Sequence, residues 1–171
     1  MSESSWTTVH TADIRQGDYL LNCYVPMFGS DFGSEESRVP VATANLIVIT
    51  QSCDLEAAKV RMVALCPAHS LAKFEEANPE YGKKRAWEPV RKGRVEGLHL
   101  LPSTTNPVDN RSSLVVDFRE IYSLPLAYLR QHADELGTRW RLNSPFLEHF
   151  SQAFARFFMR VGLPSSIPKF E

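Results

Sequence analysis

Hydrophobic positions form short β-type runs over most of the chain and one long helical stripe near its end. Asn45–Thr50 (NLIVIT) is continuously apolar and rich in β-branched residues, so we expect a strand that is buried on both faces. Tyr, Leu and Val also favour a pleated, half-buried surface. Runs of this kind predict four more strands, over Asp18–Val25, Val60–Cys66 (ended by Pro67), Gly97–Pro102 and Ser113–Phe118.

The most regular pattern lies near the C-terminal end. Phe residues recur there at intervals of three and four, which is the period of one face of a helix. We therefore predict an amphipathic helix over 144–162 that packs against the core, with Ser144 as its cap. Its stripe consists of Phe146, Phe150, Phe154, Phe157 and Val161.

The remaining segments predict shorter helices and loops. Leu71–Ala77 is expected to form a short helix, and a second should begin after Pro125 and stop at Gly137. Residues 1–12 are predicted to be a flexible lead-in, and Pro26–Pro40, rich in Gly, Ser and acidic residues, a long exposed loop. Nothing repeats along the chain, so we predict one α+β domain over residues 1–171.

Composition excludes several classes of protein. The chain has 171 residues, of which 43% are hydrophobic and 23% charged, as in ordinary globular domains. No apolar run approaches the roughly 20 residues of a membrane span, and the polar N-terminus lacks the pattern of a secretory signal. The three cysteines have no paired spacing, which is typical of a reducing compartment. We therefore expect a soluble, cytoplasmic protein that makes no membrane contact.

Four stretches, in order, resemble segments of the MazF/PemK family of toxin ribonucleases. Arg15–Asp18 (RQGD) leads into a strand, like the opening Gly-Asp of the family, and Gly33–Pro40 (GSEESRVP) is similar to its Gly-Ser-Glu loop. Val63–Ser70 (VALCPAHS) resembles the strand that ends in Pro-x-Thr/Ser. Ser113–Ile121 (SLVVDFREI) resembles the late strand of the family, which a helix follows.

The resemblance implies an SH3-like β-barrel that is often dimeric and binds single-stranded RNA. It places the barrel core at 13–129, interrupted by a basic insertion at 71–111, and leaves the C-terminal helix outside. It also implies RNA cleavage without metal or cofactor, and an antitoxin-like protein partner. The catalytic residues that it implies are Arg38, His69, Ser70 and Glu35.

These residue types suit cleavage of RNA. His69 titrates near neutral pH and can act as a base or an acid on the ribose 2′-hydroxyl. Arg38 can hold a phosphate with two hydrogen bonds and stabilise the charge that develops on it. The other interpretation is a surface arginine and a histidine at the end of a strand.

Thr50–Leu55 (TQSCDL) is a feature that the family does not supply. Cys53 can act as a nucleophile, with His69 or His99 as its base and Asp54 as the group that orients it. Alternatively, Cys53 is a metal ligand together with Cys66, His69 and His99. The third interpretation is structural: Asp54 begins a short helix at a turn. We expect no structural metal, because these residues lack the paired spacing of a zinc module.

The insertion carries a run of basic residues interleaved with one tryptophan. An aromatic ring among cations can stack on a base while the cations contact phosphates, although a solvated loop is the alternative. The formal net charge of the chain is −1, so a site for an anion has to be a local cluster. The residues concerned are Lys83, Lys84, Arg85, Trp87, Arg91, Lys92 and Arg94.

The sequence therefore favours a nucleic-acid-binding protein, and the family resemblance implies that it is a metal-independent endoribonuclease acting on single-stranded RNA. A non-catalytic interaction module that keeps the barrel and holds a protein partner is the first alternative. A site built on Cys53, Asp54 and His99, based on a thiol or a metal, is the second.

Overall fold

An antiparallel sheet of eight strands runs through the part of the chain that the computed structural model describes, residues 4–35, 38–57 and 59–159. Its strand order is β1-β8-β2-β3-β4-β6-β5, and β7 pairs with the first half of β4. Within the described residues, β1 and β5 at the two ends of this order do not pair, so the sheet is open. The strands are β1 (Trp6–Val9), β2 (Asp18–Pro26), β3 (Val41–Val48), β4 (Met62–Ser70), β5 (Leu98–Leu101), β6 (Leu114–Asp117), β7 (Tyr122–Pro125) and β8 (Arg139–Leu142).

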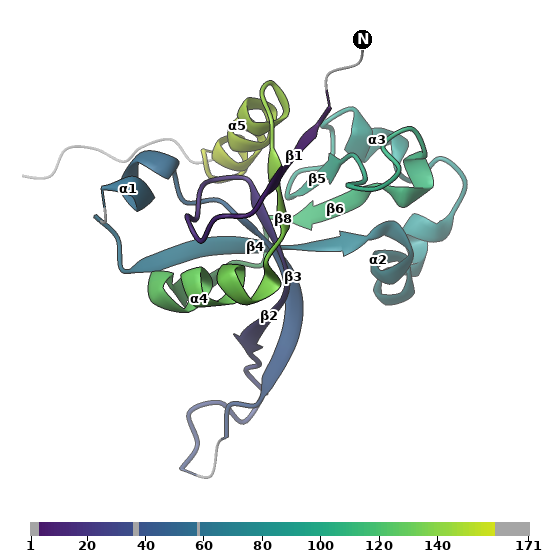
Figure 1. Cartoon of the computed structure of the whole chain (residues 1–171). Coiled ribbons are helices and arrows are strands. Elements are labelled where there is room, and N and C mark those ends of the chain that lie inside the picture. Colours follow the sequence, from purple (N-terminus) through teal and green to yellow (C-terminus); the bar gives the residue numbers. More distant parts are fainter. Residues whose placement is uncertain (1–3, 36–37, 58, 160–171) are drawn as a thin grey trace, which may run out of the picture.

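Helices cover both faces of the sheet, which makes the fold α+β (Figure 1). The two longest, α4 and α5, lie on opposite faces, while the shorter helices lie around the edges. None of the helices in the described ranges is long and apolar enough to cross a bilayer. The helices are α1 (Ser52–Glu56), α2 (Leu71–Ala77), α3 (Glu88–Arg91), α4 (Leu126–Leu136) and α5 (Phe146–Phe158), with 3-10 turns at Pro79–Gly82 and Asn110–Ser112.

The central strands are buried on both faces, as the NLIVIT run predicted. Leu46 and Val48 of β3 pack into the cluster beneath α4, whereas Ile47 and the following Ile49 pack into the cluster beneath α5. Successive side chains of a strand point to opposite faces, so one continuous apolar run contributes to two cores. A third, smaller cluster lies under α2 and α3 and includes Phe74 and Val90.

The structure corrects two predictions about strands. Residues 1–12 are not simply a lead-in, because Trp6–Val9 forms β1 and pairs with β8 in register Trp6↔Leu142. The Trp6 ring is buried and its indole N–H donates to the Pro102 carbonyl. Pro67 does not end its strand either: β7 pairs with β4 as far as Leu65 and β6 from Ala68, so a missing N–H between them costs little.

The C-terminal helix lies over the sheet. Phe150 is fully buried, and Phe146, Phe154 and Phe157 pack against the same cluster. The helix begins at Phe146, and Pro145 stands at the cap position without a side-chain hydrogen bond, so the predicted cap at Ser144 is wrong. Val161, the last residue of the predicted stripe, lies outside the described residues.

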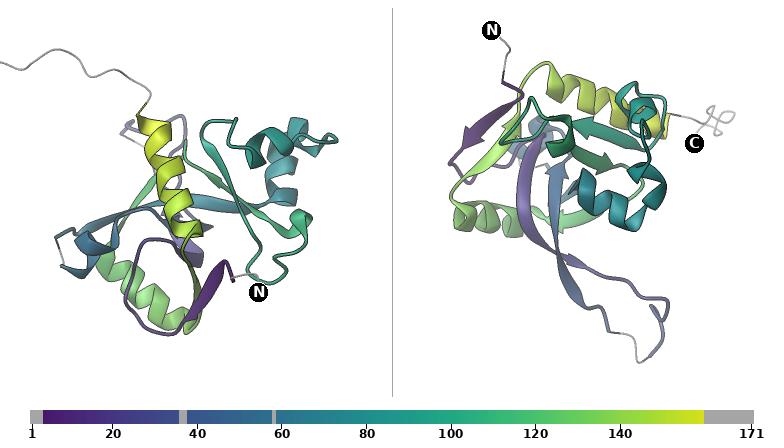
Figure 2. Two further views of the ribbon diagram at one scale, coloured as in Figure 1. Left: turned by 90° about the horizontal axis from the view of Figure 1, so that it is seen from above. Right: turned by 90° about the vertical axis from the view of Figure 1, so that its right-hand side faces the viewer.

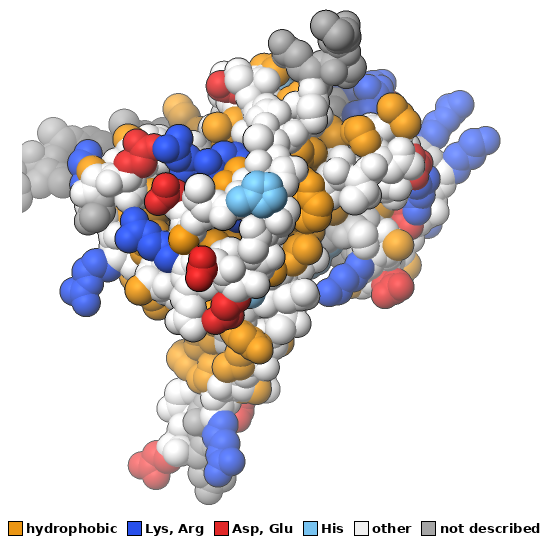
Figure 3. All heavy atoms as spheres, viewed as in Figure 1, with side chains coloured by type: hydrophobic (Ala, Val, Ile, Leu, Met, Phe, Trp, Pro, Cys, Tyr) orange, Lys and Arg blue, Asp and Glu red, His pale blue; other side chains and the backbone are white. Residues whose placement is uncertain are grey.

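β2 and β3 extend beyond the body of the protein as a two-stranded ribbon, seen in both Figure 1 and Figure 2. The predicted exposed loop, Pro26–Pro40, connects the two strands at the far end of this ribbon. Hydrophobic side chains gather where the ribbon leaves the body (Figure 3). The exposed ones on the ribbon and its loop are Tyr24, Met27, Phe28, Phe32, Val39 and Val41.

Candidate functional site

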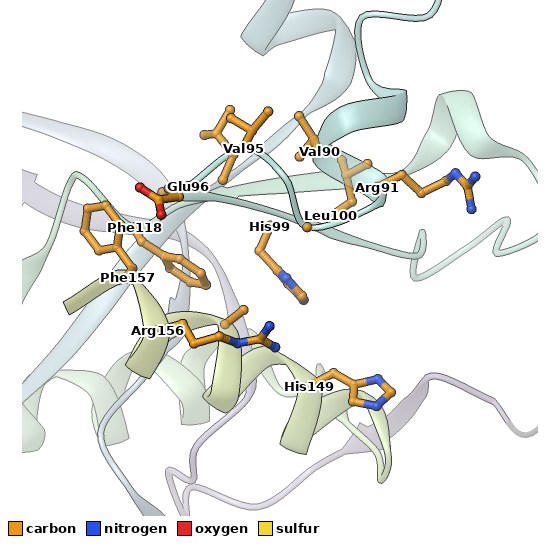
Figure 4. Close-up of a pocket in the computed structure, with 14 residues that line it drawn as sticks. Val90, Arg91, Val95, Glu96, His99, Leu100, Phe118, His149, Arg156 and Phe157 are labelled. Atoms are coloured by element: carbon orange, nitrogen blue, oxygen red, sulfur yellow. The ribbon is translucent and has the colours of Figure 1, made fainter. Parts of the chain in front are cut away.

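A cavity of about 300 Å³ lies between the segment that leads into β5 and the side of α5 (Figure 4). Val90 and Arg91 of α3, together with Val95 and Glu96, form one wall, and α5 forms the other. Cavities of this size are at the lower end of those that hold small ligands.

His99 reaches the cavity from β5. It pairs with Val116 of β6, and its imidazole stacks on Phe118 at 6.0 Å between ring centroids and an angle of 20°. The Phe150 ring lies 5.9 Å away on another side. In the described residues, no hydrogen bond occupies the ring nitrogens of His99. Aromatic packing therefore fixes the ring while its nitrogens remain available to a ligand.

Three residues of α5 face His99. His149, Ala153 and Arg156 are four and three residues apart, so they share one side of the helix. Ala153, with the smallest side chain of the three, leaves space between the His149 imidazole and the Arg156 guanidinium. Figure 4 shows His99 pointing toward α5, with Arg156 and His149 on the facing helix.

The electrostatics of the cavity favour an anion. Burial, together with the nearby charges of His149 and Arg156, lowers the pKa of His99 to about 4. His99 is therefore neutral at pH 7, and the positive charge beside it is that of the Arg156 guanidinium. Arg91 also lines the cavity, although it is paired with Glu88 at 2.9 Å. Glu96 is the acidic residue among the lining residues.

Cys53 and Asp54 do not share this cavity. They lie in α1, and Asp54 borders a second, more open groove of about 710 Å³ on the other flank of α5, together with Phe154 and Phe158. His99 lines the first cavity and not the second. Cys53 is exposed, and its thiol contacts the side-chain oxygen of Gln51.

The possible metal ligands are equally dispersed. Cys66 is fully buried in the core, where burial raises the pKa of its thiol to about 12. Among the described residues, no group of three or more His, Cys, Asp or Glu side chains has the geometry to hold a metal ion. Asp54 lies within the short helix that was expected as the structural alternative, although α1 begins at Ser52.

The residues implied by the family resemblance lie on two separate parts of the molecule. Glu35 and Arg38 belong to the loop at the end of the ribbon, whereas His69 and Ser70 end β4 (Figure 1). Ser70 caps α2 by accepting a hydrogen bond from the Lys73 backbone N–H at 3.3 Å. His69 is half-buried beside Phe74, and burial lowers its pKa. Within the described residues, no hydrogen bond or ion pair joins Arg38 to His69.

The basic insertion has an ordered aromatic centre. Trp87 packs against Tyr81 at 4.8 Å and Phe74 at 5.7 Å, and its indole N–H donates to Glu75. Its ring is thus part of the third core cluster. Arg91 and Lys92 pair with Glu88, whereas Lys83, Lys84, Arg85 and Arg94 are exposed and form no ion pair with another described residue.

Sequence reasoning singled out His99 and Arg91 but not His149 or Arg156. Their spacing of seven residues on a predicted helix was the available signal, because it places them on one side two turns apart. The Phe stripe on the same helix explained how the helix packs, and the polar residues beside the stripe were not considered as site residues. Comparison of the chain with protein-family models, with curated proteins and with solved structures found no match.

Proposed function

We propose that this protein binds single-stranded RNA and that the cavity beside His99 receives a nucleotide with its phosphate. One observation carries the proposal: His99, His149 and Arg156 line the same cavity, and they come from two elements that are far apart in sequence. A guanidinium and imidazoles are suitable donors for a phosphate. A cavity of about 300 Å³ has room for one nucleotide of an unpaired strand and not for a duplex.

The basic insertion supports the same proposal. It contains α3, whose residues Val90 and Arg91 form part of the cavity wall. A strand whose phosphate lies beside Arg156 would therefore run past the exposed cations of the insertion. Because the whole chain has a net charge of −1, binding of RNA has to rely on such a local group of cations. Those without an ion pair in the described ranges are Lys83, Lys84, Arg85 and Arg94.

The relationship to the MazF/PemK family remains a proposal, and so does the SH3-like barrel. The order of the sheet supports it. The four resembling stretches fall on or directly before β2, β3, β4 and β6, which are consecutive neighbours in the sheet. The fourth stretch leads through β7 into a helix, α4, as in the family pattern. Dimerisation, an antitoxin-like partner and a cytoplasmic location belong to the same proposal.

RNA binding can be tested by changing the shape of the cavity without changing any charge. Ala153→Leu adds a branched side chain to the floor between His149 and Arg156, so the affinity for a fluorescent single-stranded RNA should fall about tenfold or more. Ala155→Leu makes the same change on the other flank of α5 and should leave the affinity unchanged. Fluorescence anisotropy in EDTA measures both.

Salt dependence adds a second check on the same assay. Arg156→Gln removes one phosphate contact, so the slope of log affinity against log salt should become shallower by about 0.7. Arg130→Gln, an exposed arginine on α4, serves as the control. Equal binding by Ala153→Leu, Arg156→Gln and the unchanged protein would contradict the proposal.

An interaction module is the second candidate, and the ribbon favours it. Tyr24, Phe28, Phe32 and Val41 are each at least 60% exposed on the ribbon and its loop. Exposed apolar side chains gathered in one place are typical of surfaces that contact other proteins. If the protein does not bind RNA at all, this second candidate becomes the better explanation of the fold.

A further inference from the structure

We infer that the cavity between β5 and α5 is a catalytic site, in which His99 and His149 act as an acid–base pair on an RNA phosphodiester and Arg156 holds the phosphate. The inference rests on the proposed function, because it adds a reaction to the same cavity. It places the reaction in a different part of the molecule from the residues that the family resemblance implies.

Two imidazoles on facing elements suit this reaction. His99 lies on β5 and His149 on α5, and both line the cavity. Transfer of a phosphoryl group within RNA needs one group that accepts the proton of the 2′-hydroxyl and another that donates a proton to the leaving oxygen. Groups on opposite walls can reach the attacking and the leaving oxygen, which lie on opposite sides of the phosphorus.

The third residue of the site, Arg156, is placed to hold the phosphate on which the two histidines act. Arg156 is seven residues beyond His149 on the same side of α5, and Ala153 leaves the space between them open. Its Nε donates to the Gln152 carbonyl at 3.4 Å, which holds the exposed side chain along the helix. A guanidinium held in this way stabilises the negative charge that grows on the phosphate oxygens in the transition state.

His99 is the base of the pair. Burial, His149 and Arg156 lower its pKa to about 4 in the empty cavity, so it carries no proton at neutral pH. A bound phosphate offsets the positive charges of His149 and Arg156 and raises the pKa of His99 toward its ordinary value. A base becomes more effective as its pKa approaches the working pH. Binding of the substrate therefore activates His99. The other charged groups that face this cavity are Arg91 and Glu96.

The reaction conserves atoms and charge. The 2′-oxygen attacks the adjacent phosphorus while its proton passes to a ring nitrogen of His99. The bond between phosphorus and the 5′-oxygen breaks, and His149 donates a proton to that oxygen. The products are a 2′,3′-cyclic phosphate and a 5′-hydroxyl. No oxidant, reductant or further reactant is needed.

The substrate must carry its own nucleophile. This requirement defines the substrate class as RNA with an unpaired ribonucleotide, because DNA has no 2′-hydroxyl. A DNA oligonucleotide that contains a single ribonucleotide is the sharpest probe. Cleavage at that position alone, in the presence of EDTA, would report attack by the 2′-oxygen.

The experiment compares cleavage of this probe with binding of a 2′-O-methyl RNA of the same length, which cannot react. His149→Gln is the principal variant, because His149 is exposed and its loss leaves the core intact. We expect cleavage to fall about 100-fold or more while binding of the 2′-O-methyl RNA changes less than about threefold. His99→Gln should lose a similar factor and should also remove the rise of kcat/KM near pH 4. His10→Gln, an exposed histidine on the β1 side of the sheet, should cleave normally.

The outcomes separate the inference from the proposed function. If the 2′-O-methyl RNA binds at the cavity but the probe stays intact, the catalytic inference is wrong and the binding proposal stands. If neither oligonucleotide binds, the proposed function is wrong, and the catalytic inference that rests on it is wrong as well. If cleavage persists in His149→Gln and is lost in Arg38→Ala or His69→Ala, the reaction belongs to the residues implied by the family resemblance and the assignment to this cavity is overturned.

Discussion

Replacement of Asp18 by Asn is expected to lower the free energy of unfolding by about 3–5 kcal/mol. The Asp18 carboxylate is fully buried and accepts a hydrogen bond from Arg139 Nε at 2.9 Å. It also accepts hydrogen bonds from Arg141 and, at 3.1 Å, from the backbone N–H of Arg15. The Arg139 side chain is only 1% exposed, so the variant leaves its charge buried without a partner charge.

The remaining bonds of Arg139 do not compensate for this loss. Arg139 also donates to the carbonyls of Thr11 and Asp13, which are neutral groups. Urea unfolding at pH 7 measures the effect. Glu88→Gln removes an exposed carboxylate from its 2.9 Å pair with Arg91 and should cost far less than the Asp18 variant. Equal losses in the two variants would show that the buried network contributes no more than a surface ion pair.

Phe150→Ala is expected to cost about 3–5 kcal/mol as well, because it opens a cavity at the centre of the α5 interface. The Phe150 ring is fully buried, 5.7 Å from the Phe118 ring and in the same cluster as Trp6 and Tyr19. Surrounding rings cannot move far enough to fill the space. Phe154, which is only partly buried, should show a smaller effect.

Phe158→Ala is the matched control for this prediction. Phe158 lies on the same helix but is 54% exposed, so its removal should cost less than about 1 kcal/mol. Both variants can be followed by urea unfolding with circular dichroism. If Phe150→Ala proved as stable as Phe158→Ala, α5 would contribute little to the core, and the cavity wall that it forms would not be firmly placed.

Local sequence signals predicted many of the elements. Leu71–Ala77 forms α2 with the predicted bounds, since Ser70 caps its start and Asn78–Pro79 prevents its continuation. Gly137 ends α4 with a φ of 67°, a conformation that glycine adopts without strain. In such cases the residues that decide the structure are neighbours in sequence.

Long-range contacts decided what the sequence did not predict. β8 contains two arginines in four residues (RWRL), a pattern that does not indicate a strand. Both arginines instead bind Asp18, more than 120 residues earlier in the chain. β1 is equally short, and its exposed Thr7 and Thr8 gave no apolar run. Each of these strands depends on the other, because they pair together.

The candidate site followed the same rule. His99 was expected in a short strand, as a partner of Cys53 and Asp54 in a site based on a thiol or a metal. The fold places α5 between them, so that His99 lines one flank of the helix and Asp54 the other. His149 and Arg156 became candidates only when the packing of α5 against β5 was known. No local pattern specifies which flank of a helix borders a cavity.

The most direct test of the central claim is an NMR titration of the histidine side chains with 2′-O-methyl RNA. Bound RNA should shift the imidazole signals of His99 and His149 together, with saturation at one equivalent, and should raise the pKa of His99 from about 4. The signals of His10 should not move, because His10 lies beside Thr138 and away from the cavity. RNA that bound without shifting the signals of His99 or His149, or that shifted only the signal of His69, would contradict the claim that this cavity is the functional site.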